Sequence, residues 1–265
     1  MLTSEVENYP GFKDGILGPE LMENMTKQAE RFGAETVFED ATKVDFSGRP
    51  FKVKAGEVVH EGKTVIIATG ASPKLLGLES ERRLMGRGVS VCATCDAAFF
   101  RDKVAVVVGG GDTALQEALE LVRFVSQVKI VHRRNQLRAS SVLQERTRNN
   151  PKVEFIWNST VQEILGEANV EGVRLKRTDT GEETTLKCDA IFVAVGHEPN
   201  TQIFRGQVEL DEKGYVVAKD GTKTSVEGVF VAGDVHDYRY RQAITAAGEG
   251  CKAALDALKY LEETA

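Results

Sequence analysis

The 265-residue chain has few cysteines, one tryptophan and no excess of basic residues. Its four cysteines are too few for a disulfide scaffold, which is the usual device of small secreted domains. With 34 basic and 40 acidic residues the net charge is −6, and this argues against the basic surface that binds a nucleic-acid backbone. No apolar run approaches the roughly 20 residues that span a bilayer. We therefore expect a globular cytoplasmic protein that binds neither nucleic acid nor membrane.

Two of the four cysteines lie close together in the segment VCATCDAAFF. Cys92 and Cys95 can close and reopen a small disulfide, and the helix dipole favours a thiolate at the N-terminal end of a helix. Asp96 follows directly and can supply or accept a proton. The spacing also suits half of a zinc site or an inert buried pair. Because Cys188 and Cys251 are isolated, we expect a redox pair and no metal.

Apolar patterns predict alternating helices and strands, which is typical of an α/β protein. Helices are expected over 19–34, 113–124 and 240–261, and strands over 63–70, 103–108, 127–131, 153–157, 172–177, 190–195 and 228–232. The strand 103–108, the helix 113–124 and the strand 127–131 make a βαβ unit of the usual length.

A weak similarity between two segments of the sequence indicates how the domains are connected. Residues 64–74 and 190–200 each contain an apolar strand, a small-x-Gly turn and a proline. Two such turns predict two crossings between domains. We expect residues 73–196 to form a domain that is inserted into another domain made of residues 1–72 and 197–265.

A glycine-rich turn follows the strand 103–108 and opens the next predicted helix. Its candidate nucleotide-binding residues are Gly109, Gly110, Gly111, Asp112, Thr113 and Ala114. They match G-x-G-x-x-A, in which the glycines allow a tight turn and a close approach of a pyrophosphate to the helix N-terminus. A glycine turn that binds nothing is the alternative.

The strand after this turn ends in a basic run. About twenty residues after the glycines, where an NAD site places an acid, the chain has His132, Arg133 and Arg134, with Arg138 a turn further on. Guanidinium groups pair with a 2′-phosphate, which an acid would repel. We therefore predict NADPH rather than NADH, with a solvated basic surface run as the alternative.

Five segments together resemble the low-molecular-weight thioredoxin reductases over essentially the whole chain: VCATCDAAFF, VVVGGGDTALQEA, VHRRNQLRAS, AVGHEPNT and VFVAGDVHDYRYRQAITAAGEG. The resemblance implies two Rossmann-like domains, with an NADPH domain that carries the dithiol inserted into an FAD domain. It further implies that electrons pass from NADPH through FAD to the dithiol and on to thioredoxin. A rotation between the domains would present NADPH and the dithiol to the flavin in turn, and the full-length form would be a homodimer.

The resemblance also assigns roles to individual residues. Cys92 would attack the disulfide of thioredoxin, Cys95 would face the flavin, and Asp96 would protonate the product thiolate. The residues implied in FAD binding are Asn8, Asp234, Arg241, Gln242 and Ala243. Those implied in thioredoxin docking are Arg87, Phe99 and Phe100.

The chain departs from this family at its start. Family members begin with a strand, a G-x-G-x-x-G turn and a helix that bind the FAD pyrophosphate, and nothing of this kind precedes the segment EVENYPGF. We expect Met1 to be an internal methionine of a longer protein, because exposing a core loses about 25 cal/mol per Å² of apolar surface; a shortened form is the alternative. The FAD domain would then be truncated at its N-terminus. Thioredoxin reduction is the expected activity, and a flavin-free fragment that binds NADPH or a partner is the second reading.

Overall fold

In the computed structural model, which describes residues 5–264, the chain divides into two units. The first unit comprises the residues up to Glu23 together with Pro73–Gly196, and the second comprises Asn24–Ser72 together with the residues from His197 onward. Residues before Asn24 therefore group with 73–196, whereas 1–72 was expected to group with 197–265. The division falls inside helix α1 (Gly18–Arg31).

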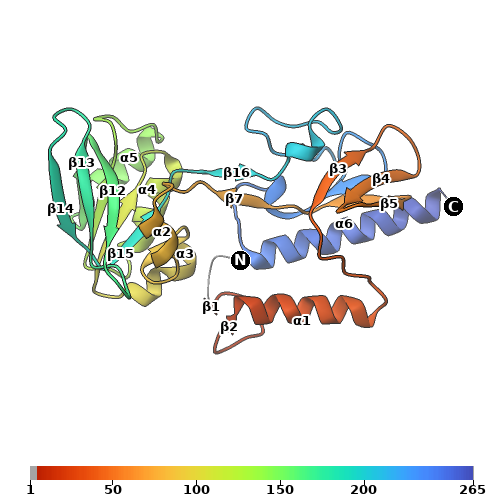
Figure 1. The fold of residues 1–265 in the computed structure, drawn as a ribbon, viewed down its shortest axis with the longest axis horizontal. Coiled ribbons are helices and arrows are strands. Elements are labelled where there is room, and N and C mark those ends of the chain that lie inside the picture. Colours follow the sequence, from red (N-terminus) through yellow and green to blue (C-terminus); the bar gives the residue numbers. More distant parts are fainter. Residues whose placement is uncertain (1–4, 265) are drawn as a thin grey trace. The chain divides into compact units, whose positions relative to one another are not determined.

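The chain crosses between the units three times, once inside α1 and twice further on, at Pro73 and at His197. Strands β7 (Ala71–Pro73) and β16 (His197–Pro199) lie at the last two crossings and pair with each other. Figure 1 shows these two strands side by side. Each unit is described below by itself.

A five-stranded parallel sheet forms the centre of the first unit, in the order β11-β10-β9-β15-β8. Its strands are β8 (Val89–Ser90), β9 (Val104–Val108), β10 (Gln127–Val131), β11 (Val153–Ile156) and β15 (Ala190–Val193). Along β9, Ala105 and Val107 pack on one face, and Val106 and Val108 pack on the other. Both faces of the sheet are therefore buried, which explains the continuous apolar run of this strand.

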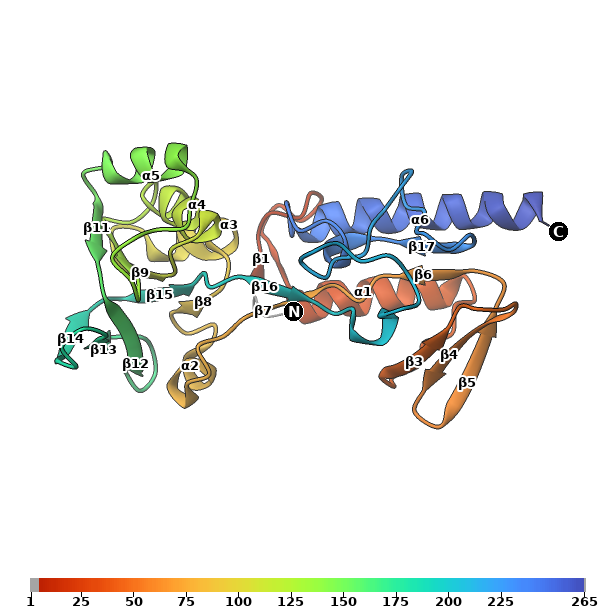
Figure 2. The ribbon, with the colours of Figure 1, turned by 90° about the horizontal axis from the view of Figure 1, so that it is seen from above.

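Different layers cover the two faces of this sheet (Figure 2). Three helices lie on one side: α3 (Ala93–Asp96), α4 (Asp112–Leu121) and α5 (Ser141–Arg148). On the other side lie α2 (Glu79–Leu84) and an antiparallel sheet of β12 (Ser159–Leu165), β13 (Gly172–Arg177) and β14 (Glu183–Lys187). Leu115 and Leu121 fill the helical side, while Ile164 and Leu175 fill the other.

Two small elements complete this unit. A short 3₁₀ helix, η1 (Ala97–Phe100), follows α3, and the strands β1 (Glu5–Val6) and β2 (Ile16–Leu17) form a small hairpin.

The second unit is built around the parallel pair β6 (Val65–Ile67) and β17 (Val229–Val231). The long helix α6 (Ala243–Glu263) packs on this pair, where Ala253 and Ala257 meet Phe230. These two alanines are one helical turn apart, so their small side chains let the helix approach the strands closely. The remaining elements are the antiparallel strands β3 (Ala41–Asp45), β4 (Phe51–Ala55) and β5 (Val58–Gly62) and the 3₁₀ helices η2 (Gln202–Phe204) and η3 (Gly233–Val235).

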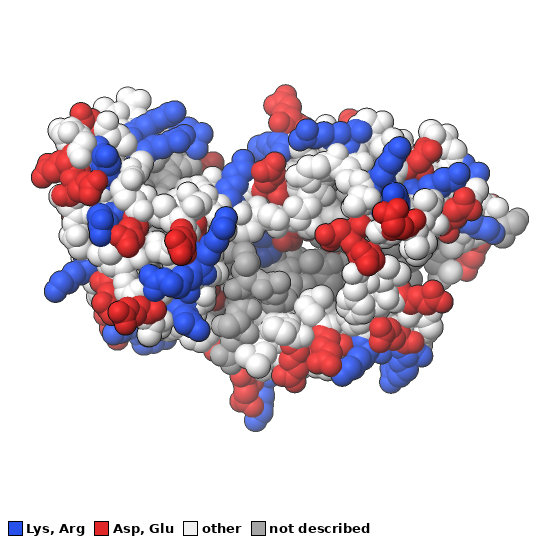
Figure 3. Space-filling view, viewed as in Figure 1, with Lys and Arg blue, Asp and Glu red and all other residues white. Residues whose placement is uncertain are grey.

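The surface carries charges of both signs. Basic and acidic side chains are interspersed over the face shown in Figure 3, in keeping with the near balance of their numbers. Among residues 5–264, no helix has the length and apolar character needed to cross a membrane.

The α/β class and the main elements predicted from the sequence are confirmed. Strands β10 and β13 have the predicted bounds, and α1, α4 and α6 lie within three residues or fewer of theirs. The elements that were not predicted are the helices α2 and α5 and the strands β1 to β5, β7, β8, β12, β14 and β16. Strands β5 and β14 are mostly exposed and carry few buried apolar side chains, so they lack the alternation that would have revealed them.

Candidate functional site

A disulfide joins Cys92 and Cys95 at the start of helix α3. Cys92 is the N-cap residue, and its Sγ accepts a hydrogen bond from the backbone N–H of Cys95 at 3.2 Å. After reduction, the same N–H would stabilise a thiolate on Cys92. The predicted position of the dithiol at a helix N-terminus is confirmed, and both side chains are only partly buried.

Asp96 ends this helix, and its carboxyl group is partly buried. Burial raises the pKa of Asp96 above the ordinary value of a carboxyl, and a hydrogen bond from Ser90 opposes this shift. Ser90 Oγ donates to Asp96 Oδ2 at 2.6 Å and accepts from the backbone N–H of Cys92 at 3.1 Å. One buried hydroxyl therefore connects the acid to the first cysteine. Ser90 was not predicted as a site residue, and its position two residues before Cys92 is the signal that could have found it.

Glu117 is a second residue that sequence reasoning missed. Its carboxylate, on helix α4, accepts a hydrogen bond from the backbone N–H of Ala93, the first residue of α3. Helix α4 begins at the glycine turn, so one helix connects this turn with the dithiol within the first unit.

The three consecutive glycines of the turn have different neighbours. A Cβ on Gly109 would lie 2.4 Å from the carbonyl oxygen of Ala194, and one on Gly110 would lie 2.3 Å from the ring of His132. A Cβ on Gly111 would meet nothing within 4 Å. The fold itself therefore requires the first two glycines, whereas Gly111 borders open space at the N-terminus of α4.

The side chain of His132 packs against the glycine turn at Gly110. This side chain is buried, and its Nε2 lies 3.0 Å from the carbonyl oxygen of Gln136. Burial is the main cause that lowers the pKa of His132, and the neighbouring arginines lower it further. The ring is therefore neutral and packs against Gly110, and a direct contact of His132 with a nucleotide stays a prediction.

The basic run bends back over the glycine turn. The backbone N–H of Arg138 donates to Gly110 O at 2.7 Å, and Asp112 Oδ1 accepts from the N–H of Ser140 at 2.7 Å. The side chains of Arg133, Arg134 and Arg138 are exposed. None of the residues that the structure describes pairs with their guanidinium groups. These groups are thus available to a ligand bound at the turn.

A separate polar cluster lies in the second unit. Arg241 precedes α6 with a left-handed φ of 52°, and its Nε is buried without a hydrogen-bond partner among the described residues, as is His197 Nδ1. Burial lowers the pKa of His197 to about 4, and the charge of Arg241 contributes to this shift. Burial also raises the pKa of Asp234, while Arg241 opposes that shift. Two unsatisfied nitrogens beside a partly desolvated carboxyl fit a polar ligand; His197 was not among the predicted site residues.

The turn that carries Asp234 is held by helix α6. Glu249 Oε2 accepts from the N–H of Gly233 at 2.7 Å and lies 2.8 Å from His236 Nε2. Gln242 is the N-cap residue of α6 and Ala243 is its first residue. The structure therefore brings Asp234, Arg241, Gln242 and Ala243 to one end of this helix. Asn8, by contrast, is exposed between β1 and β2 and groups with the first unit.

The three predicted docking residues differ in exposure. Arg87 is exposed, and so is Phe99, of which 49% of the surface is accessible. Phe100 is partly buried and makes an edge-to-face contact with Phe192 at 5.8 Å. Phe100 is therefore mainly a core residue, and the docking role of all three stays a prediction.

Comparison with known proteins identifies the family. Residues 1–250 match the family described as pyridine nucleotide-disulphide oxidoreductase. A thioredoxin reductase of Streptomyces clavuligerus is 54% identical over 264 residues, which cover 98% of this chain and 82% of the relative. The chain belongs to the thioredoxin reductases. Thioredoxin reductase 2 of Arabidopsis thaliana is 51% identical over 98% of this chain and 71% of its own.

A solved structure supports the same conclusion. The thioredoxin reductase from Giardia duodenalis matches with a TM-score of 0.93 and 43% identity, over 98% of this chain and 86% of the solved one. The resemblance to thioredoxin reductases that the motifs indicated is thereby confirmed.

Proposed function

We propose that this thioredoxin reductase chain carries electrons from NADPH, through FAD, to the Cys92–Cys95 disulfide and then to the disulfide of thioredoxin. The observation that carries the proposal is this disulfide at the start of α3, directly beside the partly buried acid Asp96. The names of the relatives support thioredoxin as the protein substrate.

Residues 73–196 would bind NADPH. The pyrophosphate fits the open space beside Gly111, because the N-terminus of α4 offers backbone N–H groups and a positive dipole end. The exposed guanidinium groups of Arg133, Arg134 and Arg138 would bind the 2′-phosphate through charged hydrogen bonds. This arrangement supports NADPH over NADH, because no carboxylate stands at the end of β10.

Residues 1–72 and 197–265 would hold FAD. Arg241 and His197 would satisfy their unpartnered nitrogens on polar atoms of the flavin group, with Asp234, Gln242 and Ala243 beside them. When bound, the flavin supplies the relay that turns a hydride from NADPH into an electron pair for the disulfide. The role of Asn8 in FAD binding stays a prediction.

The dithiol then works by thiol–disulfide exchange. Two electrons break the Cys92–Cys95 bond and leave both sulfurs as thiolates. Cys92 Sγ attacks one sulfur of the thioredoxin disulfide, that disulfide breaks, and the leaving thiolate takes the proton of Asp96. Cys95 Sγ next attacks Cys92 Sγ, which restores the internal disulfide and releases the second thioredoxin sulfur as a thiolate. That thiolate and Asp96 are protonated by solvent.

Arg87 and Phe99 would contribute a cation and an aromatic ring to the surface on which thioredoxin docks, with Phe100 behind them. A homodimer and a cytoplasmic location remain predictions.

Trapping of thioredoxin tests this proposal without requiring flavin. The chain with Cys95→Ser is reduced, freed of reductant and mixed with oxidised thioredoxin, and the products are separated on a non-reducing gel. A mixed disulfide through Cys92 is expected with excess oxidised thioredoxin, because Cys95 can no longer attack Cys92 Sγ. Only the thiol freed on thioredoxin can reverse this step, so the mixture is quenched with acid before the products are separated. Adding Cys251→Ser, which removes an exposed cysteine elsewhere, should leave the adduct unchanged. If Cys92→Ser traps thioredoxin instead, Cys95 is the attacking cysteine and Cys92 the resolving one. An adduct that is lost with Cys251→Ser would contradict the proposal.

A further inference from the structure

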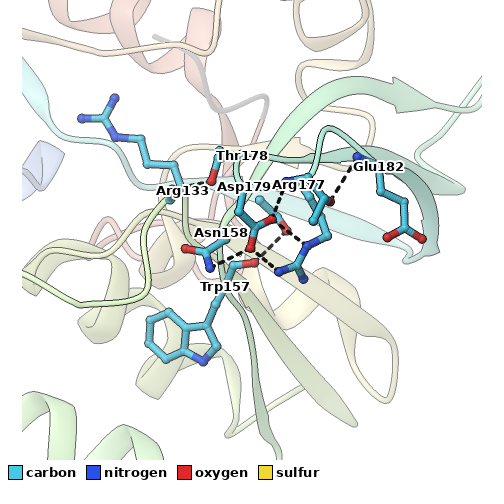
Figure 4. Close-up of polar contacts among 9 residues, drawn as sticks. Arg133, Trp157, Asn158, Arg177, Thr178, Asp179 and Glu182 are labelled. Carbon is cyan, nitrogen blue, oxygen red and sulfur yellow. Dashed lines mark hydrogen bonds and ion pairs between the residues drawn. The ribbon is translucent and has the colours of Figure 1, made fainter.

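The basic run of His132, Arg133 and Arg134 directly follows β10. Hydrogen bonds join its backbone to a hairpin turn that comes much later in the sequence. This turn joins β13 to β14 and contains Thr178 and Asp179, and Asn158 lies beside it, directly before β12. Figure 4 shows these residues around the backbone of Arg133, whose own side chain points away from the Asp179 carboxylate.

Two hydrogen bonds hold the backbone of the run. The hydroxyl of Thr178 donates to the carbonyl oxygen of Arg133 at 3.2 Å. The backbone N–H of Asn158 donates to the carbonyl oxygen of Arg134 at 3.4 Å. The N–H of Thr178 in turn donates to Asn158 O at 2.7 Å, so the two residues that hold the run are bonded to each other.

The turn itself is tightly fixed. Arg177 donates to both oxygens of Asp179, from Nε at 2.9 Å and from a terminal nitrogen at 2.5 Å. The hydrogen bond from Arg177 is the main cause that lowers the pKa of Asp179 to about 2. Asn158 Nδ2 donates to the same carboxylate at 3.2 Å, and Asn158 has a left-handed φ of 51°, which asparagine adopts more readily than most residues.

The same network binds the negatively charged carboxylate of Asp179. Asp179 is ionised, and Arg177 and Asn158 already use both of its oxygens. The carboxylate is therefore committed to the turn, and the guanidinium groups of Arg133 and Arg134 stay available to a ligand.

We propose that Thr178 and Asn158 are positioning residues that set the preference for a 2′-phosphorylated nucleotide by fixing the backbone from which Arg133 and Arg134 project. This inference rests on the proposed binding of NADPH at these arginines. Two guanidinium groups pair with one phosphate only at set distances, so freedom of their backbone weakens that contact. The adenosine and 5′-phosphate contacts do not depend on the arginines, and they should be unchanged.

The test uses the full chain and two small ligands that differ only by the 2′-phosphate, adenosine 2′,5′-bisphosphate and adenosine 5′-monophosphate. Binding is measured by calorimetry and by the fluorescence of Trp157, the single tryptophan, whose ring lies 6.4 Å from that of His132. Thr178→Val removes the hydroxyl and keeps the branched shape. This substitution should lower the affinity for the bisphosphate about three- to tenfold, which is the usual effect of losing one hydrogen bond. The affinity for the monophosphate should change by less than about twofold.

Three controls make the result decisive. Thr178→Ser keeps a hydroxyl and should keep the preference for the bisphosphate over the monophosphate. Asn158→Gly keeps the backbone N–H and the left-handed φ, so it should weaken this preference less than Thr178→Val does. Thr185→Val, on the exposed strand β14 outside this network, should change neither affinity.

Two outcomes separate this inference from the proposed function. Equal losses for both ligands in Thr178→Val, or none for either, would overturn the positioning role. If Arg133→Ala together with Arg134→Ala leaves the preference for the bisphosphate intact, the proposed NADPH site itself fails.

Discussion

Ser90 Oγ donates a hydrogen bond of 2.6 Å to Oδ2 of Asp96. Burial raises the pKa of Asp96, and this hydrogen bond favours the charged form and limits the rise. Because the same hydroxyl accepts the N–H of Cys92, Ser90 adjusts the acid and orients the attacking cysteine together.

Replacement of Ser90 by Ala should therefore raise the pKa of Asp96 further. An acid with a higher pKa keeps its proton to higher pH, so the alkaline fall in the rate of thioredoxin reduction should move upward. Asp96→Asn, which cannot donate a carboxyl proton, should lower the rate about 10²-fold. The rate is measured in a single turnover with pre-reduced chain across the pH range. Ser80→Ala is the matched control, since Ser80 is also buried and binds the N–H of Ile164 elsewhere; an unmoved profile in Ser90→Ala would refute the link.

The nucleotide preference depends on charge at the end of β10. Replacing Arg133 and Arg134 by Ala should weaken NADPH binding by at least about 10²-fold, since each charged hydrogen bond contributes about 1.5–3 kcal/mol. NADH lacks the 2′-phosphate, so its affinity should stay nearly constant. Titration by calorimetry measures both, and replacement of Arg146 and Arg148 on α5 is the control with the same change in charge. Equal losses for NADPH and NADH would argue against the assignment.

Two neighbouring glycines should respond differently to alanine. In Gly110→Ala the new Cβ meets the buried His132 ring, so we expect about 1–3 kcal/mol of destabilisation from overpacking. In Gly111→Ala the methyl group meets no protein atom, so the stability should change by less than about 1 kcal/mol, while nucleotide binding is lost because the methyl group fills the space of the phosphate. Thermal unfolding and nucleotide titration distinguish the two effects. Full binding in Gly111→Ala would show that the phosphate lies elsewhere.

His197 should make the second unit sensitive to acid. Its pKa is lowered from 6.5 to about 4 by burial, so the folded state holds the neutral ring and the unfolded state binds the proton more readily. The stability from this residue is therefore complete above pH 6.5 and falls as the pH drops toward 4. His197→Gln should reduce this fall in urea denaturation, and His60→Gln, on the exposed strand β5, should not. Identical acid dependence in all three proteins would contradict the burial of a neutral His197.

Local sequence patterns were sufficient for the elements that hold the site. The apolar run of β9, the glycines that follow it and the amphipathic helix α4 are contiguous, so their spacing alone predicted a strand, a turn and a helix. The pair Cys92 and Cys95 likewise predicted both a disulfide and its place at a helix start, because both properties depend on neighbouring residues.

Long-range contacts could not be predicted in this way. Glu117 binds the N–H of Ala93 across 24 residues, and Thr178 binds Arg133 across 45. The charge of Arg241 likewise lowers the pKa of His197, a residue on another element. A serine, a threonine or a glutamate has the same local pattern whether or not it finds such a partner. The sequence by itself determined which residues are candidates for the chemistry. The tertiary structure alone decided which buried hydroxyls, carboxylates and backbone groups lie beside them, because hydrogen bonds depend on distance in space and not on distance along the chain.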